Sequence, residues 1–231
     1  MMKYIYLIRH GKTAGNKDKR YVGSTDESLC EAGIYEINER RNTLLRSFSP
    51  ENETDGMSQI STVYKGNILP HKVYVSPMLR CRQTADLLFP GVEQEVVVDF
   101  REMDFGLFEY KNYEELAGDA RYQAFIDSGG QLDFPDAEPQ KQFRERVRNA
   151  FAHCVIRERK WHVAGDENFK SDEQREPFVF VVHGGTIMAI MEEFARPRRG
   201  YFEWQVGAGG GYRCELRCEG DGFYLDHVTE I

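Results

Sequence analysis

Two histidines stand directly after apolar runs of the sequence. The run from Tyr4 to Ile8 ends in Arg9 and His10, and the run from Phe178 to Val182 ends in His183. Both runs read as buried strands, so we expect these polar residues at the C-terminal edge of a sheet. Ligands bind at that edge in open α/β sheets. A neutral imidazole beside a guanidinium is a nucleophile next to a clamp for oxyanions, which suits phosphoryl transfer.

Other polar residues stand at the ends of further predicted elements. Asn16 and Thr25 lie on the loops after the first strand, and Arg80 lies where a strand gives way to a helix. Arg82 competes with Arg80 for a role in anion binding. Two positions correspond to about 200° around a helix, so we expect Arg82 to face elsewhere.

One carboxylate is a candidate acid and base. Glu102 follows Arg101 directly and precedes Phe105 and Gly106 in a loop. Asp104 and Glu109 compete with it, and we expect these two to be solvated or hydrogen-bonded loop carboxylates.

Taken in order, these blocks resemble the histidine phosphatase superfamily, the phosphoglycerate-mutase-like fold. The resemblance runs from Lys3 to about Val228, and it is closest to the branch of α-ribazole phosphatases and broad-specificity phosphatases. It implies that His10 attacks phosphorus through Nε2 and carries the phosphoryl group while its Nδ1–H needs a backbone carbonyl. It also implies that Arg9, Arg80 and His183 bind the phosphate oxygens. Glu102 would then protonate the leaving alkoxide and activate the incoming water.

The resemblance adds neutral donors to this set. Asn16 and Thr25 would donate to phosphate or substrate, although a turn-capping role explains Thr25 equally well. The N–H groups that follow His183, beginning with Gly184, would add a helix N-terminus to the clamp.

The elements that must position these residues alternate between strand and helix. This pattern predicts an α/β layered sheet, and the resemblance implies a three-layer sandwich with a mostly parallel central sheet flanked by helices. The predicted strands are Lys3–Arg9, Lys72–Ser76, Glu95–Val98, Phe178–His183, Tyr212–Arg217 and Gly222–His227. The predicted helices are Thr13–Lys19, Cys30–Phe48, Arg80–Leu88, Tyr113–Ser128, Pro139–Arg159 and Thr186–Phe194.

We expect residues 1–231 to form one domain. A small helical cap at about 105–138 would read the leaving group, and two polar stretches, 49–66 and 161–177, have the composition of insertions. The cap region is rich in aromatic residues, which could favour an aromatic or nucleoside-like alcohol, and an ordinary packed cap explains them equally well. The residues concerned are Phe105, Phe108, Tyr110, Tyr113, Tyr122 and Phe125.

Composition narrows the class of partner. The net charge of −8 argues against nucleic acid or an anionic membrane, and no apolar run has the length of a membrane span. The five cysteines are scattered and odd in number, which fits reduced thiols in a cytoplasmic protein. Cys214 and Cys218 share one face of a predicted strand, but no further ligands at suitable spacing suggest a metal site. We expect a monomer or homodimer without a cofactor.

The sequence therefore predicts a metal-independent phosphomonoesterase that hydrolyses a small phosphorylated metabolite through phosphohistidine. α-Ribazole 5′-phosphate is the most specific candidate substrate, and broad specificity or another small metabolite is an equal alternative. Two features depart from the superfamily pattern. The loop from Arg20 to Asp26 lacks the tryptophan usual in mutases, which favours hydrolysis, and Tyr110 replaces a common glycine, which could alter the pocket wall. The alternatives are a cofactor-dependent mutase and a non-catalytic binder of phosphorylated ligands.

Overall fold

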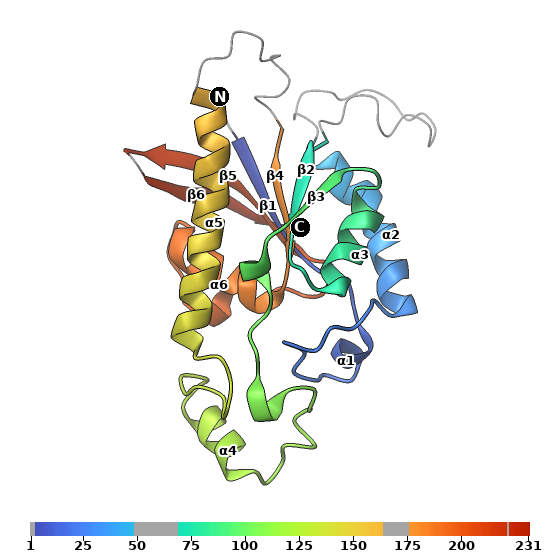
Figure 1. The fold of residues 1–231 in the computed structure, drawn as a ribbon, viewed down its shortest axis with the longest axis vertical. Coiled ribbons are helices and arrows are strands. Elements are labelled where there is room, and N and C mark those ends of the chain that lie inside the picture. Colours follow the sequence, from blue (N-terminus) through green and yellow to red (C-terminus); the bar gives the residue numbers. More distant parts are fainter. Residues whose placement is uncertain (1–2, 49–68, 164–175, 221) are drawn as a thin grey trace.

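The computed structural model describes residues 3–48, 69–163, 176–220 and 222–231, with side chains omitted for 159–163 (Figure 1). One sheet of six strands runs in the order β3-β2-β4-β1-β5-β6. The strands β3, β2, β4 and β1 are parallel, and β5 and β6 are antiparallel additions at one edge. Their bounds are β1 Lys3–Arg9, β2 Lys72–Val75, β3 Glu93–Val96, β4 Phe178–Val182, β5 Gly211–Glu219 and β6 Gly222–Glu230.

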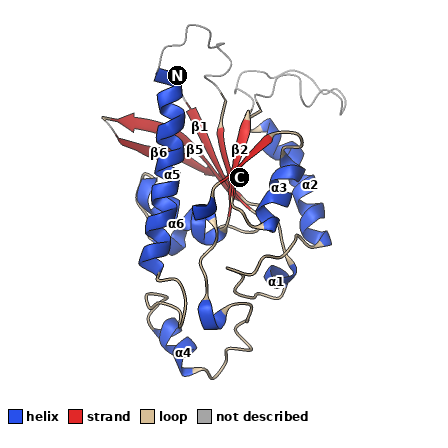
Figure 2. Cartoon of the chain, viewed as in Figure 1, coloured by secondary structure: helices blue, strands red, loops and turns tan. Residues whose placement is uncertain are grey.

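Helices cover both faces of this sheet, which confirms the predicted α/β layers (Figure 2). Alternate side chains of β1 explain why: Tyr6 and Ile8 pack in one apolar cluster with α2 and α3, whereas Ile5 and Leu7 pack in another with α5 and α6. The helices are α1 Ala14–Lys17, α2 Glu31–Arg46, α3 Leu79–Leu88, α4 Ala120–Asp127, α5 Gln140–Val163 and α6 Gly184–Phe194.

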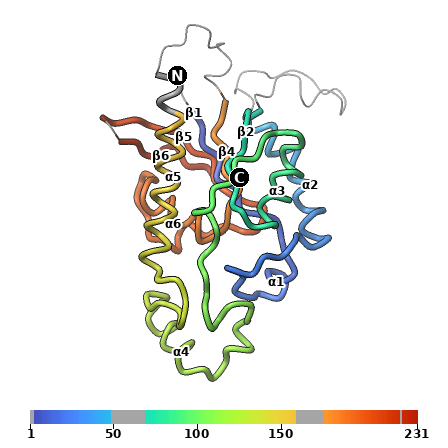
Figure 3. The backbone as a smooth tube through the Cα atoms, in the orientation of Figure 1, coloured from blue at the N-terminus to red at the C-terminus, as the bar shows by residue number. Residues whose placement is uncertain are grey.

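The chain between β3 and α5 leaves the sheet and carries helix α4 far below it in the view of Figure 3. The predicted helix Tyr113–Ser128 is wrong in its first half, because the helix begins only at Ala120. Gly118 has a φ of +86°, which a right-handed helix does not accommodate, and the side chain of Asp119 caps the helix by accepting from the N–H of Arg121.

The two predicted polar stretches lie largely outside the residues that the structure describes. The stretch 49–66 lies wholly outside the described residues, and 164–175 of the stretch 161–177 does too. Helix α5 continues to Val163, past the predicted end at Arg159. In the described part of the chain, no helix is long and apolar enough to cross a membrane.

Candidate active site

The carboxyl ends of the parallel strands bring the two predicted histidines together. Arg9 ends β1 opposite Val182 of the neighbouring strand β4, so the residues that follow, His10 and His183, meet at the same edge of the sheet. Their ring centroids are 5.1 Å apart and the ring planes make an angle of 67°. The expected edge-of-sheet site is therefore formed by the topology itself.

His10 is held in one tautomer. Its Nδ1 lies 2.7 Å from the carbonyl oxygen of Gly11, which can only accept, so Nδ1 carries the proton and the Nε2 lone pair is free. The N–H of Gly11 donates to Oγ1 of Thr84 at 3.0 Å, which fixes the peptide that holds the ring. Burial, followed by the charges of Arg80 and Arg9, lowers the pKa of His10 well below 6.5. The imidazole is therefore neutral at neutral pH.

Two arginines, the buried Arg80 and the half-buried Arg9, lie close to this ring, and each has an Nε without a hydrogen-bond partner in the described part of the chain. Arg9 donates from Nη1 to the carbonyl oxygen of Val206 at 2.7 Å, and burial lowers its pKa. Arg80 is fully buried and its Nη1 and Nη2 donate to carbonyl oxygens of Thr25 and Gly23, at 2.7 and 2.9 Å. The Nε atoms of Arg9 and Arg80 are buried without a partner among the described residues. Such unpaired donors are costly unless a ligand meets them.

His183 is supported by residues that the sequence analysis did not single out. Its Nε2 lies 2.7 Å from Oγ of Ser76 and 3.5 Å from Sγ of Cys81. Burial, with Arg80 next in importance, lowers the pKa of His183 well below 6.5. A signal existed for Thr84, which lies four positions after Arg80 and so shares its face of helix α3, whereas Ser76 stands between β2 and α3.

Glu102 is a buried carboxylate at the same site. Burial raises its pKa, against the opposing effect of hydrogen bonds from the N–H groups of Met103 and Gly185. The N–H of Gly185 donates to Oε2 at 2.9 Å, and a Cβ at Gly185 would lie 2.4 Å from Oε1. Only glycine therefore permits this approach of helix α6 to the carboxylate.

Arg146 of helix α5 fixes the backbone around Glu102. Its Nη2 donates to the carbonyl oxygen of Glu102 at 3.1 Å, and its Nη1 donates to that of Arg101 at 2.9 Å. The guanidinium also forms an ion pair of 2.6 Å with Glu138. This anchor joins the candidate acid to the long helix of the sandwich.

The remaining predicted residues divide into two groups. A cavity of about 590 Å³ is lined by Arg9, His10, Asn16, Glu102 and Gly184 of the predicted set. Arg80, His183 and Thr25 are not among the described residues that line it. Instead, the hydroxyl of Thr25 donates to Oε1 of Glu109 at 2.7 Å, which corresponds to the turn-stabilising alternative.

The residues that competed with Arg80 and Glu102 for roles in the site lie where the sequence analysis expected them, away from the cavity. Arg82 is exposed, on the side of helix α3 away from Arg80. Asp104 accepts from the N–H of Gly106 at 2.8 Å, and Glu109 is a hydrogen-bonded loop carboxylate. Glu102 is thus the only one of the three carboxylates that lines the described cavity.

The apolar lining of the cavity comes partly from the cap and partly from other segments of the chain. Of the six cap aromatics picked out in the sequence, only Phe105 and Phe125 line it, and Phe108 is buried in the core. The other apolar lining residues come from separate segments and include Tyr21, Ile126, Phe134, Met188, Tyr201 and Phe202. Tyr110 does not line the cavity as described, so the expected change to the pocket wall does not arise there.

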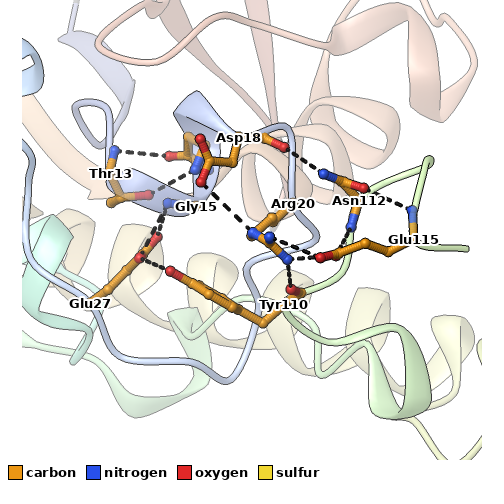
Figure 4. A network of polar contacts seen from close by, with 9 residues as sticks. Thr13, Gly15, Asp18, Arg20, Glu27, Tyr110, Asn112 and Glu115 are labelled. Atoms are coloured by element: carbon orange, nitrogen blue, oxygen red, sulfur yellow. Dashed lines mark hydrogen bonds and ion pairs between the residues drawn. The ribbon is translucent and has the colours of Figure 1, made fainter.

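A polar network ties the cap to the loop after β1 (Figure 4). Arg20 donates from Nη1 to the carbonyl oxygen of Tyr110 and to Oε2 of Glu115, each at 2.6 Å, and from Nη2 to Oε1 of Glu115 at 3.0 Å. Glu27 accepts from the hydroxyl of Tyr110 and from the N–H of Gly15, both at 3.2 Å. Arg20 lines the cavity, but its charge is matched by Glu115.

Comparisons with known proteins agree with this architecture. "Probable phosphoglycerate mutase GpmB" of Klebsiella pneumoniae (strain 342) is 25% identical over 161 residues, which are 67% of this chain and 64% of that protein. This chain thus spans less than two thirds of the length of the curated relatives it matches.

Solved structures share the fold along nearly the whole chain. The α-ribazole phosphatase of Shigella flexneri superposes with a TM-score of 0.66 at 19% identity, over 96% of this chain and 94% of the other. A mycobacterial glucosyl-3-phosphoglycerate phosphatase in complex with VO3 gives a TM-score of 0.72 at 19% identity, over 96% of both chains. The family model that describes such sequences matches residues 5–50 and 54–230, and the chain belongs to the histidine phosphatase superfamily, branch 1.

Proposed function

We propose that this protein is a metal-independent phosphomonoesterase that works through a phosphohistidine on His10. The observation that carries the proposal is the fixed tautomer: Nδ1 is committed to the Gly11 carbonyl, so Nε2 presents its lone pair beside buried guanidinium groups. Arg9 and Arg80 each retain an unpartnered Nε, which suits the oxygens of a phosphoryl group.

In the first step, Nε2 of His10 attacks phosphorus and the bond from phosphorus to the ester oxygen breaks. Glu102, whose pKa burial raises, gives a proton from its carboxyl group to the departing alkoxide. In the second step, the Glu102 carboxylate takes a proton from water, which attacks the phosphohistidine. Phosphate leaves, and neutral His10 and protonated Glu102 are restored.

The other predicted residues have supporting roles in this proposal. Asn16, which lines the cavity, and the N–H of Gly184 at the start of α6 would donate to phosphate oxygens. His183 would complete the clamp beside His10. Thr25 is assigned to holding its loop, since its hydroxyl donates to Glu109.

The cavity favours an alcohol with an uncharged, apolar body as the leaving group. Its far wall is formed by Phe105, Phe125 and Phe134 with other apolar side chains. Arg9 and Arg20 are the cationic residues among its described lining, and Arg20 is paired with Glu115. α-Ribazole 5′-phosphate, which carries an aromatic base, has these properties and is the most specific candidate substrate.

A mutase that interconverts phosphoglycerates is the second candidate. The name of the relative from Klebsiella pneumoniae favours it. A phosphoglycerate carries a second anionic group that needs its own cations. The apolar wall and the paired Arg20 favour hydrolysis of an uncharged alcohol ester instead.

One assay tests the proposal. Wild-type protein and the His10→Ala variant are incubated with EDTA and a panel containing α-ribazole 5′-phosphate, p-nitrophenyl phosphate and 3-phosphoglycerate. We expect EDTA-resistant release of phosphate that disappears in the variant. Interconversion of phosphoglycerates without net phosphate release would establish the mutase instead, and inertness towards every ester would leave a phosphate-binding protein.

A further inference from the structure

The loop at residues 22–26 is held by a carboxylate through its N–H groups. Oε1 of Glu109 accepts from the N–H groups of Gly23 and Thr25, both at 2.9 Å, and from the Thr25 hydroxyl at 2.7 Å. Its Oε2 accepts from the N–H of Phe105 at 3.3 Å. One side chain thus satisfies four donors on two segments of the chain.

The carbonyls of the same loop bind a buried guanidinium. Arg80 donates from Nη1 to the Thr25 carbonyl oxygen at 2.7 Å and from Nη2 to that of Gly23 at 2.9 Å. Among the described residues, no carboxylate oxygen lies within ion-pair distance of Arg80, although this side chain is fully buried. A buried cation with only neutral partners is costly.

The carboxylate of Glu109 is bonded to the same loop whose carbonyls bind Arg80. One continuous chain joins the two groups: Nη2 of Arg80 lies 3.5 Å from the carbonyl oxygen of Val22, whose peptide unit carries the N–H of Gly23 that donates to Glu109. Hydrogen bonds in such a chain polarise one another and grow stronger together. Both terminal nitrogens of Arg80 are then occupied, and Nε is the donor left for a ligand.

We propose that Glu109 is the positioning residue for Arg80: it holds the loop whose carbonyls orient the guanidinium, so that Nε meets a phosphate oxygen. This inference rests on the proposed function, in which Arg80 binds the transferring phosphoryl group. Both carboxylate oxygens of Glu109 are taken up by donors of the protein itself, so Glu109 acts through Arg80 rather than on the substrate.

A purely structural role of Glu109, in which it only stabilises the loop, makes a different prediction. The loop also packs closely against the backbone at Met103, since a Cβ at Gly23 would lie 1.9 Å from the Met103 carbonyl oxygen. That close contact keeps the backbone of Gly23 packed against Met103 when the Glu109 charge is removed, so under the proposal Glu109 controls the direction of the loop carbonyls rather than the place of the loop. If Glu109 only stabilised the loop, Glu109→Gln would lower the free energy of unfolding without changing the affinity for phosphate.

The test compares Glu109→Gln with Asp104→Asn, a matched control that neutralises a carboxylate of the same segment whose bond is to Gly106. Dissociation constants for inorganic phosphate are measured by calorimetry, and kcat/KM with p-nitrophenyl phosphate. We expect Glu109→Gln to weaken phosphate binding and lower kcat/KM by about ten-fold or more, because misplaced donors lose much of their effect. We expect the control to stay within about two-fold of wild type, as surface substitutions do.

A double-mutant cycle with Arg80→Lys isolates the coupling. We expect Glu109→Gln to have less than half of its logarithmic effect on phosphate affinity when Arg80 is already replaced, since neighbours that act together are not additive. Equal effects in both backgrounds, or phosphate affinity unchanged by Glu109→Gln, overturn the inference. Because the phosphate titration needs no turnover, wild type that binds phosphate without hydrolysing any ester contradicts the proposed function alone.

Discussion

The glycine that admits Glu102 to the site offers the sharpest test of the acid role. Replacing Gly185 with alanine puts a Cβ 2.4 Å from Oε1 of Glu102 and 3.1 Å from its Cδ. Ordinary contact begins near 3.4 Å, so the carboxyl group must retreat by about 1 Å. Its backbone cannot follow easily, because Arg146 donates to the carbonyl oxygen of Glu102 at 3.1 Å.

A displacement of about 1 Å lowers the rate of a positioned reaction by up to about 100-fold. The loss should appear with alkyl phosphates, whose alkoxide needs a proton as it leaves. p-Nitrophenyl phosphate needs little proton donation, so its kcat/KM should fall by no more than about three-fold. Hydrolysis of both esters by purified Gly185→Ala, with thermal denaturation to establish that the variant is folded, gives the comparison.

The matched control is Gly207→Ala, since a Cβ at Gly207 meets no atom within 4 Å. It should hydrolyse both esters as wild type does. Equal losses on the two esters in Gly185→Ala would refute the reasoning, because they would mean that helix α6 and the phosphate clamp had moved rather than the acid. An unchanged rate with alkyl phosphates would remove Glu102 from the acid role.

Two further predictions concern pH and the cap. Burial lowers the pKa of His10 and His183, so below pH 6.5 the unfolded chain binds more protons, and the free energy of unfolding should fall with falling pH by up to about 1.4 kcal/mol per pH unit for each imidazole. Burial raises the pKa of Glu102, so in the pH range where this group titrates it opposes the fall, by up to about 1.4 kcal/mol per pH unit. Urea denaturation at pH 7 and at pH 5.5 measures the net change in the free energy of unfolding. A higher free energy of unfolding at pH 5.5 would contradict the prediction. Tyr110→Gly should change stability by less than about 1 kcal/mol, because release of the left-handed backbone at φ +59° offsets the lost bond to Glu27, and kcat/KM should stay at the wild-type value.

The sequence was sufficient for features that depend on local pattern. The apolar run predicted a strand from Lys3 to Arg9, and these are the ends of β1. A nucleophilic imidazole needs a backbone acceptor for its Nδ1–H, and the carbonyl oxygen of Gly11 provides it. Strand endings at His10 and His183 were enough to predict that both residues lie at the C-terminal edge of the sheet, whereas the adjacency of β1 and β4, which brings the two rings together, came from the structure.

What the sequence did not predict depends on pairs that are distant along the chain. Arg20 and Glu115 are 95 positions apart, and no periodicity links them. The Thr25 hydroxyl finds its acceptor 84 positions away in Glu109, so the choice between a substrate contact and a turn bond was open. The cavity wall at Phe134 and Phe202 combines the cap with the segment that follows α6, which no single segment encodes.

The arrangement of charges explains why one site can hold a neutral imidazole and a protonated carboxyl group together. Arg9 and Arg80 lower the pKa of His10 and also lower that of Glu102, against the effect of burial on the carboxyl group. Under the proposed mechanism, a phosphate dianion bound to the guanidinium groups offsets their charge at both residues. The pKa of Glu102 then rises further, so the carboxyl group keeps its proton when the leaving alkoxide needs it. The Nε2 lone pair of His10 meanwhile is consumed by phosphorus rather than by a proton, because attack follows binding directly. Substrate binding thus favours the protonated form of Glu102, whereas at His10 it raises the pKa that burial and the two guanidinium groups hold low.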